Sequence, residues 1–380
     1  MTVFTINTIN AEVLPLHESH IEGIIELMNK EGWYYYDVHE LRRYLNLDQD
    51  CFTLIKARRV IGSIFTTNYT AQAWIGNIVI AEEERGKGLA AGLIKGTINY
   101  LQKKRNILTF RLGSVPLAIG LYKKLGFRAE AFTTSQEVEL PLKLDNENEN
   151  MGEHLHLERL EEEDLEAVAE IDRQFFRSDR LGFLTDLYKS SIREGCVGLK
   201  DRGKIVGFLM IRRRKASQEE GGFAEGPDHV YRLGPSCVLP KYGTKGFKAL
   251  FQEGIRAVNE EVALLDGSAK IYAVFPRNAD REQIFNDTWK LAEAMGMDGN
   301  INLDTIFDEH EHIFGAQKSR KNEDQWTYMK DLGFHQEYFE QVMSYTPGEA
   351  KRVQPYRRKT EGTRADPEGI FALATPGDKA

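Results

Sequence analysis

A glycine-rich turn after an apolar segment is the feature that most constrains the fold of this chain. The run Ile75 to Ile80 is typical of a β-strand, and Arg85 to Ala90 then reads Arg-Gly-Lys-Gly-Leu-Ala at the start of a helical pattern. Glycine adopts positive φ at little cost, and the free N–H groups and dipole of a helix start favour anions. The sequence therefore predicts a strand, a turn and a helix that together bind a diphosphate.

The spacing of this turn argues against two other nucleotide loops. The turn lacks the Lys-Ser/Thr ending of an ATP-binding P-loop and the three-glycine pattern of dinucleotide folds. Arg85, Gly88 and Ala90 instead fit the pattern RxxGxA, and Ile78 and Ile80 precede it.

A second motif lies downstream of the turn. It has the form LYxxxGF and consists of Leu121, Tyr122, Gly126 and Phe127. Through these motifs, in this order, roughly the first 145 residues resemble the GNAT superfamily of acetyl-CoA-dependent N-acetyltransferases. In that family the equivalent loop grips the diphosphate of coenzyme A.

The resemblance implies an α/β fold in which helices flank a mixed, largely antiparallel sheet. The expected elements of this first unit are strands at Ala11 to Leu16, Cys51 to Ala57, Val60 to Tyr69, Ala73 to Ile80, Leu108 to Gly113, Arg128 to Ala131 and Ser135 to Leu142, and helices at Ile21 to Lys30, Val38 to Asn46, Gly88 to Lys103 and Pro116 to Leu125. The family splays its fourth and fifth strands apart, here Ala73 to Ile80 and Leu108 to Gly113. The acyl-bearing arm of the cofactor lies in that opening.

The resemblance also implies which residues contact acetyl-CoA. They lie on the fourth strand, in the turn, at the end of the fifth strand and on the helix after it: Ile78, Val79, Ile80, Arg85, Gly86, Lys87, Gly88, Leu89, Ala90, Ser114 and Tyr122. The backbone amide of Ile80 would polarise the thioester carbonyl. The family often has asparagine seven residues before the tyrosine, where this chain has Val115, so Ser114 is the nearest polar substitute.

Two side chains are candidates for proton transfer. Tyr122 matches the tyrosine that the family uses as a general acid, and a phenol with a reference pKa of about 10 can pass a proton to a departing thiolate. Glu31 precedes Gly32 and Trp33, a place where relatives carry Glu-Gly-Trp, and is the candidate general base. The alternatives are that Tyr122 is a packing residue and that Glu31 only ends a helix, with proton loss through water.

The rest of the chain predicts a second, degenerate unit of the same family. The expected order is a GNAT domain at 1–145, an acidic linker at 146–153, a GNAT-like domain at 154–346 with a helical insertion near 299–321, and a tail at 347–380. Lys241 to Gly246 stands where the second phosphate loop belongs but lacks RxxGxA. Leu332-Gly333-Phe334 repeats the ending of the first unit. This predicts a tandem arrangement, in which the second unit can lend a wall to the substrate pocket.

Charge and cysteine usage bound the remaining possibilities. A formal net charge of −8 argues against nucleic acid as a partner. No run of about twenty apolar residues and no signal peptide are evident, and three cysteines fit a reducing compartment, so the cytoplasm is the expected location. We predict no metal site. Monomer and homodimer both remain open.

The predicted function is direct transfer of an acetyl group from acetyl-CoA to a primary amine of a small molecule or peptide. No cysteine has its own histidine partner, which favours transfer without a covalent intermediate. The alternatives are a non-catalytic acyl-CoA-binding sensor and a transferase that uses a longer acyl group or a protein amino terminus.

Overall fold

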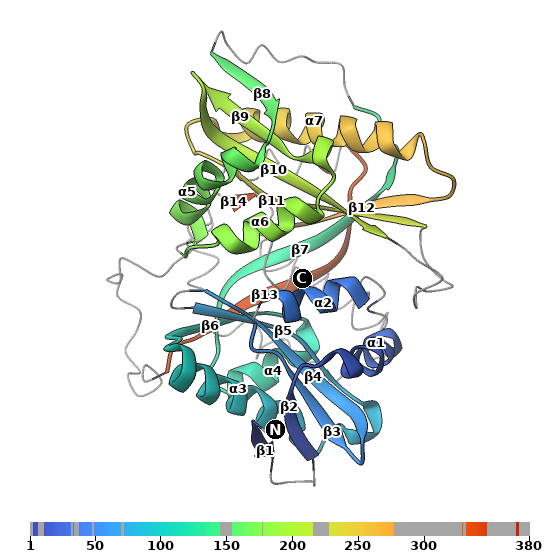
Figure 1. Ribbon diagram of the computed structural model, residues 1–380, viewed down its shortest axis with the longest axis vertical. Helices are drawn as coiled ribbons and strands as arrows, with labels where there is room; N and C mark the ends of the chain where they lie inside the picture. The colour runs from blue at the N-terminus through green and yellow to red at the C-terminus, as the bar shows by residue number, and fades with distance from the viewer. Residues whose placement is uncertain are drawn as a thin grey trace.

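The computed structural model describes residues 3–6, 11–31, 33, 38–47, 49–69, 72–144, 154–176, 178–215, 228–276, 329, 332–347 and 370–371. The chain forms two halves, each a set of strands covered by helices, stacked one above the other in Figure 1. The predicted insertion near 299–321 lies outside the described residues.

The first half contains the first six strands and four α-helices. Its strands are β1 (Phe4–Ile6), β2 (Ala11–Pro15), β3 (Phe52–Lys56), β4 (Arg59–Asn68), β5 (Gln72–Ile80) and β6 (Thr109–Ser114), and its helices are α1 (Ile21–Lys30), α2 (Val38–Asn46), α3 (Leu89–Arg105) and α4 (Pro116–Lys124). α1 packs against β4 and β5, and α3 packs against β1 and β5. The predicted elements as far as Leu125 are confirmed to within a few residues, and β1 is an addition. The two strands predicted at Arg128 to Ala131 and Ser135 to Leu142 form instead one continuous strand, β7 (Arg128–Leu140).

The second half repeats this order. Its elements are β8 (Leu155–Arg159), α5 (Leu165–Phe176), α6 (Leu181–Ser190), β9 (Val197–Asp201), β10 (Lys204–Lys215), β11 (His229–Val238), α7 (Gly243–Val262) and β12 (Ala269–Pro276). In the second half α7 follows β11, just as α3 follows β5 in the first half. The second unit of the same fold, which the sequence predicts, is therefore confirmed.

One sheet runs through both halves. Its strand order is β1-β2-β3-β4-β5-β6-β13-β7-β12-β11-β10-β9-β8, and β14 (Ile370–Phe371) pairs with β11 outside this path. Among the described strands, the pairs β5–β6 and β11–β12 are parallel and the others are antiparallel. The mixed, largely antiparallel sheet is thus as predicted.

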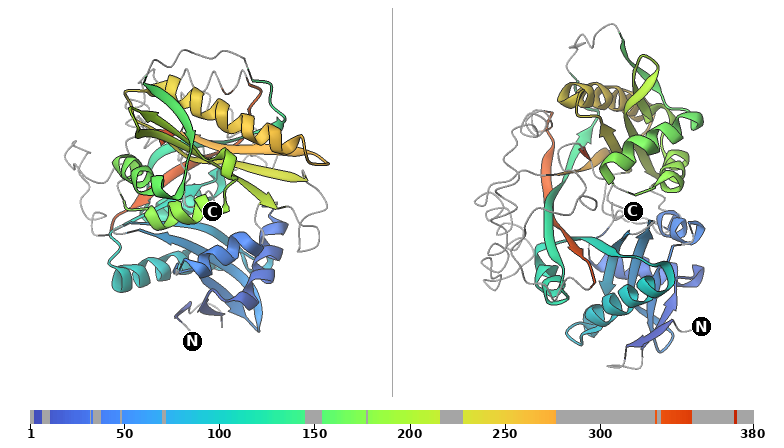
Figure 2. Two further views of the ribbon diagram at one scale, coloured as in Figure 1. Left: turned by 45° about the horizontal axis from the view of Figure 1, so that its top comes forward. Right: turned by 90° about the vertical axis from the view of Figure 1, so that its left-hand side faces the viewer.

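Two strands, β7 (Arg128–Leu140) and β13 (His335–Tyr345), join the halves. β7 follows the first half but pairs with β12 of the second, whereas β13 comes from the end of the second half and pairs with β6 of the first. The two strands also pair with each other and run side by side between the halves in Figure 2. The division at 145 and 154 therefore describes order along the chain rather than two separate sheets.

The hydrophobic core has separate centres in the two halves. The first contains residues of α1, α3 and the central strands, with Ile94, Phe110 and Met343 fully buried together. Met343 belongs to β13, so the core of the first half includes a residue from the far end of the chain. Burial of such apolar side chains stabilises the shared sheet as one structure.

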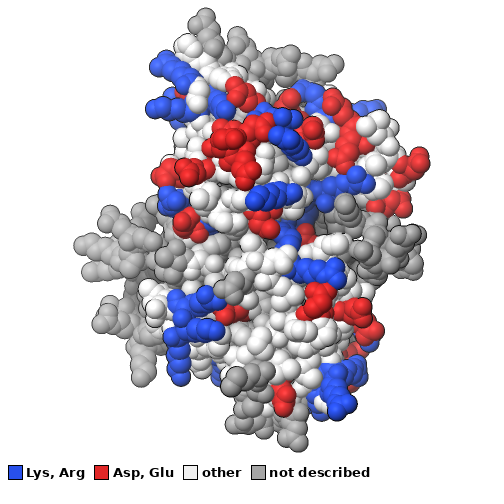
Figure 3. All heavy atoms as spheres, viewed as in Figure 1, with Lys and Arg blue, Asp and Glu red and all other residues white. Residues whose placement is uncertain are grey.

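The surface mixes charges of both signs. On the face shown in Figure 3, acidic and basic side chains are interspersed over the second half, and much of the first half is uncharged. Among the described residues, the helices are all too short or too polar to cross a lipid bilayer.

Candidate active site

The turn between β5 and α3 has the backbone conformation that its glycines permit. A short 3-10 helix, Glu82–Glu84, follows β5, and then Gly86 and Gly88 adopt φ of +75° and +76°. Gly88 is the N-cap of α3, and it provides no side chain to bond the free N–H groups of the first turn. Those amides are available to an anion, as at other helix starts.

Arg85 ties this turn to two neighbouring elements. Its Nε donates to the carbonyl oxygen of Ile80 at 3.0 Å, and its Nη2 forms an ion pair with the Glu31 carboxylate at the end of α1. Two residues that the sequence assigned to different tasks, cofactor binding and proton abstraction, are therefore direct partners beside the turn.

Glu84 is a buried acid beside the turn. It is the last of the three glutamates after β5 and is only 8% exposed. Its carboxylate accepts hydrogen bonds from Lys56 at 2.7 Å and from Lys87 at 2.9 Å, which hold the pKa of this carboxyl below its ordinary value. Lys87, a predicted cofactor contact, is thus held against the turn by a buried acid.

The predicted opening between the fourth and fifth strands is present. β5 and β6 pair in parallel only from Gln72↔Thr109 to Trp74↔Arg111, and β5 continues without β6 to Ile80. A bulge at Asn77, with φ of +49°, interrupts the pairing of β5 with β4, and Ser63 Oγ donates to the Asn77 carbonyl at 3.0 Å. The bulge bends β5 away from its parallel neighbour.

Alternate backbone groups of β5 face this opening. Ala81 N–H donates to the Ile61 carbonyl on β4 at 2.9 Å. Backbone groups of consecutive residues alternate sides along a strand, so the amide of Ile80 faces away from β4 and toward the opening. The residue two positions earlier, Ile78, follows the same alternation, whereas the backbone of Val79 faces β4, with which it pairs opposite Ser63.

Tyr122 lies on α4, which begins with Pro116 and stops before Gly126 at φ of +93°. Its ring is 7% exposed and meets Phe127 edge to face, with centroids 5.8 Å apart. Ser114 ends β6, is 1% exposed, and donates its hydroxyl proton to the Val115 carbonyl at 2.9 Å. Its hydroxyl is therefore used within the chain.

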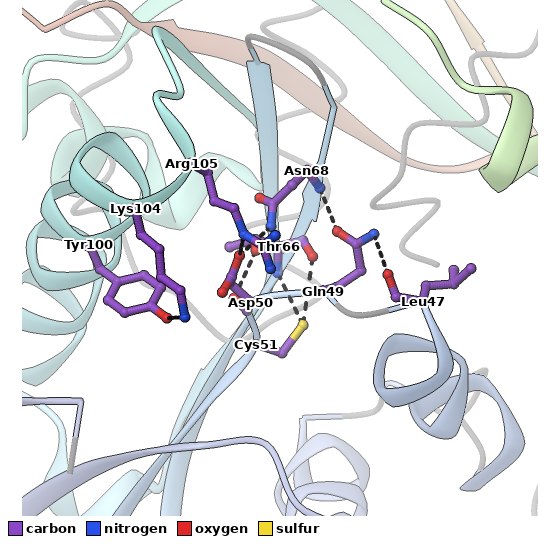
Figure 4. Close-up of polar contacts among 9 residues, drawn as sticks. All are labelled: Leu47, Gln49, Asp50, Cys51, Thr66, Asn68, Tyr100, Lys104 and Arg105. Atoms are coloured by element: carbon purple, nitrogen blue, oxygen red, sulfur yellow. Dashed lines mark hydrogen bonds and ion pairs between the residues drawn. The ribbon is translucent and has the colours of Figure 1, made fainter. Parts of the chain in front are cut away.

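α3 is also anchored at the end opposite the turn. Figure 4 shows Arg105 of α3 donating to Asp50 Oδ2 at 2.7 Å, where Asn68 Nδ2 donates as well at 2.9 Å. Gln49 Oε1 accepts a hydrogen bond from the backbone N–H of Asn68 at 2.7 Å. This network fixes the C-terminal end of α3 to the far end of β4.

The second half covers one end of the opening. Trp74, in the last paired rung of β5, stacks on Phe176 of α5 at 6.4 Å, and Gln72 Nε2 donates to the Phe176 carbonyl and to Ser178 Oγ at 3.1 and 2.6 Å. Arg111 in turn donates to Gln72 Oε1. These contacts place the second unit beside the part of β5 that pairs with β6, and the wall of the substrate pocket stays a prediction.

A cavity of about 320 Å³ lies beside this contact. It is lined by residues of both halves, from the segment after α2, from the end of β4, and from the start of α6 with the two residues before it: Leu47, Gln49, Thr67, Asn68, Tyr69, Asp179, Arg180, Leu181, Gly182 and Phe183.

In the part of the second half that the structure describes, the corresponding site features are absent. Its α7 begins at Gly243, so most of the predicted loop Lys241 to Gly246 is helical rather than a glycine-rich turn. Gly333 has φ of +90°, and Phe334 N–H donates to the carbonyl of Met329, just as Phe127 N–H donates to that of Tyr122. Met329 therefore occupies the position of Tyr122 and has no hydroxyl to donate.

Comparison with known proteins agrees with this geometry. Residues 20–139 match a family model described as the acetyltransferase (GNAT) domain. The first half of the chain is therefore a GNAT domain. This GNAT protein is 22% identical over 214 residues to the uncharacterized N-acetyltransferase YitH of Bacillus subtilis (strain 168), a match that covers 55% of this chain and 71% of that protein. The matches identify the chain as an acyltransferase.

Solved structures extend the likeness to both halves of this GNAT chain. A putative acetyltransferase from Pyrococcus horikoshii has a TM-score of 0.57 at 13% identity, covering 98% of this chain and 96% of that one. A tandem GNAT protein from the clavulanic acid biosynthesis pathway has a TM-score of 0.54 at 11% identity, covering 91% of this chain and 100% of that one. The fold is therefore a tandem GNAT arrangement.

Proposed function

We propose that the first half binds acetyl-CoA between β5 and β6 and transfers its acetyl group to a primary amine of a small molecule or peptide. The observation that carries the proposal is the early end of the β5–β6 pairing at Trp74 and Arg111, because it leaves the rest of β5 free beside the glycine turn. A narrow, strand-lined opening that leads to a helix start suits a thioester on a long arm that ends in a diphosphate.

The residues of the turn fit this cofactor. A Cβ built on Gly86 or Gly88 would meet no atom within 4 Å, so space for a ligand lies against the backbone at both positions. Amides from Gly86 to Ala90 would bind the diphosphate, with Arg85 and Lys87 adding positive charge. Acetyl-CoA would supply the acetyl group as an activated thioester.

The protein groups would then divide the chemistry. The Ile80 amide donates a hydrogen bond to the thioester oxygen and stabilises negative charge that develops there. The Tyr122 hydroxyl would donate its proton to the sulfur that leaves as the amine nitrogen forms the new C–N bond. Water would take the amine proton, and Tyr122 would regain a proton from water. Cys51, Cys196 and Cys237 are all buried, which supports direct transfer over a cysteine-bound intermediate.

The first test is thiol release from acetyl-CoA with a panel of primary amines, together with calorimetric binding of acetyl-CoA. We expect one bound acetyl-CoA per chain and amine-dependent release. Tyr122→Phe should lower kcat by on the order of 10²-fold and leave acetyl-CoA affinity unchanged. Binding without release for any amine would favour a sensor, and an unchanged kcat in Tyr122→Phe would remove its role as the acid.

A further inference from the structure

A chain of aromatic contacts connects Tyr122 to the far end of the polypeptide. The Tyr122 ring contacts Phe127, whose centroid lies 5.4 Å from that of Tyr345, and Tyr345 also packs on Phe110 at 6.5 Å. Tyr345 is the last residue of β13, the strand from the second half that pairs with β6. A residue more than two hundred positions away along the chain therefore packs behind the proposed acid.

The backbone of the turn after α4 is fitted to Tyr345 as well. Gly126 has positive φ, and a Cβ there would lie 3.1 Å from Tyr345 Cε2. Phe127 N–H closes the turn by donating to the carbonyl of Tyr122 itself at 3.0 Å. The ring of Tyr345 thus supports both Phe127 and the turn that ends the helix of Tyr122.

The second half has the reciprocal contact without the aromatic ring. The atom nearest to a Cβ built on its Gly333 is Val138 Cγ2 at 3.7 Å, and Val138 belongs to β7 of the first half. Each turn is therefore packed by the strand that the other half supplies. The half with Tyr122 receives a tyrosine, whereas the half with Met329 receives a valine.

We propose that Tyr345 is a positioning residue that fixes the Tyr122 phenol through Phe127, so that the second half sets the geometry of proton transfer in the first. This inference rests on the proposed function, because it concerns the same site. A side chain whose neighbours lock its rotamer keeps a catalytic group in productive geometry, and a small misplacement is costly.

The test compares Tyr345→Leu, which removes the ring, with Tyr345→Phe, which keeps it. We expect Tyr345→Leu to lower kcat about tenfold and to leave the KM for acetyl-CoA within about twofold, with Tyr345→Phe close to the native enzyme. Tyr100→Leu is the matched control, because Tyr100 packs on Phe52 at 5.1 Å on α3, away from α4. It should retain kcat, whereas equal losses in both leucine variants would mean general destabilisation and overturn the proposal.

A double variant separates positioning from structural damage. If Tyr345 acts through Tyr122, Tyr345→Leu should cost almost nothing further in a Tyr122→Phe background, because coupled residues are not additive. A full additional tenfold loss in that background would overturn the proposal.

A spectroscopic measurement keeps the inference testable if the proposed function fails. With 3-fluorotyrosine placed at position 122 of the full chain, Tyr345→Leu should shift and broaden the fluorine resonance, and Tyr345→Phe and Tyr100→Leu should not. If the native protein releases no thiol with any amine, the proposed function is contradicted. The fluorine resonance still tests whether Tyr345 positions Tyr122. An unchanged resonance in Tyr345→Leu would contradict the positioning role alone.

Discussion

Arg85 and Glu31 form an ion pair that joins the glycine turn to the end of α1, while Arg85 also donates to the Ile80 carbonyl. Arg85 thus links the strand whose amide faces the opening to the turn proposed to hold the diphosphate. The pairing bears on Glu31 as well, because it holds the Glu31 carboxylate beside the turn. We therefore propose that Glu31 tunes cofactor binding.

This proposal predicts opposite effects for the two partners. Glu31→Gln removes a negative charge near the diphosphate and should tighten acetyl-CoA binding about threefold, whereas Arg85→Gln should weaken it at least about tenfold. Calorimetric Kd values measure both effects. A measurement of kcat can contradict the proposal. A kcat loss on the order of 10²-fold in Glu31→Gln would show that Glu31 is the general base.

The left-handed conformation of Gly88 predicts a cost for any side chain there. Gly88→Ala should destabilise the protein by roughly 1 kcal/mol and weaken acetyl-CoA binding, because alanine disfavours φ of +76° even though no atom blocks its Cβ. Gly120→Ala is the control, since Gly120 lies within α4 with open space around it and should gain roughly 0.5–1 kcal/mol. Urea unfolding compares them, and equal effects would refute the backbone argument.

Local patterns in the sequence were sufficient for most elements of the first half and for its glycine turn. The glycine turn, the helix start at Pro116 and the helix stop at Gly126 depend on neighbouring residues, and the structure has all three. The short strand β1 was missed, because its three residues carry little periodicity. It packs where α3 has Gly92 and Gly96, whose missing side chains make room for Ile6 and Phe4.

The exchange of β7 and β13 could not be predicted from the same patterns. Each strand has an ordinary alternating sequence. Neighbouring residues in the sequence do not determine whether Tyr345 of β13 or a residue of β7 pairs with Phe110 of β6. The partners of Glu84 were missed for a related reason, because Lys56 belongs to a strand distant in sequence. Contacts between distant segments are set by packing of the whole chain, which a single sequence does not display.

The interface between the halves contains a buried ion pair whose loss should be costly. Arg180 Nε donates to Asp172 Oδ2 at 2.8 Å, and the guanidinium lies 3.8 Å from the Phe176 ring centroid. Asp172→Ala should destabilise the protein by about 3–5 kcal/mol, since it leaves a buried cation unpaired, and Asp172→Leu with Arg180→Leu should recover much of that loss. Denaturant midpoints measure both, and a loss below about 1 kcal/mol in the single variant would show that water reaches Arg180.

The buried thiols predict how stability changes at alkaline pH. Burial raises the pKa of Cys196 from 9.0 to about 11, so the unfolded chain loses this proton first as pH rises. The resulting stabilisation is complete below pH 9 and is lost as pH rises toward 11, by at most about 2–3 kcal/mol. Between pH 9 and 11 the free energy of unfolding of Cys196→Ala should therefore fall less than that of the native protein. Urea unfolding at a series of pH values measures this difference. Val197→Ala is the control, because it creates a cavity at a neighbouring buried residue and leaves the thiol in place. Its free energy of unfolding should change with pH as in the native protein. The same pH dependence in all three proteins would show that the Cys196 thiol is not the source.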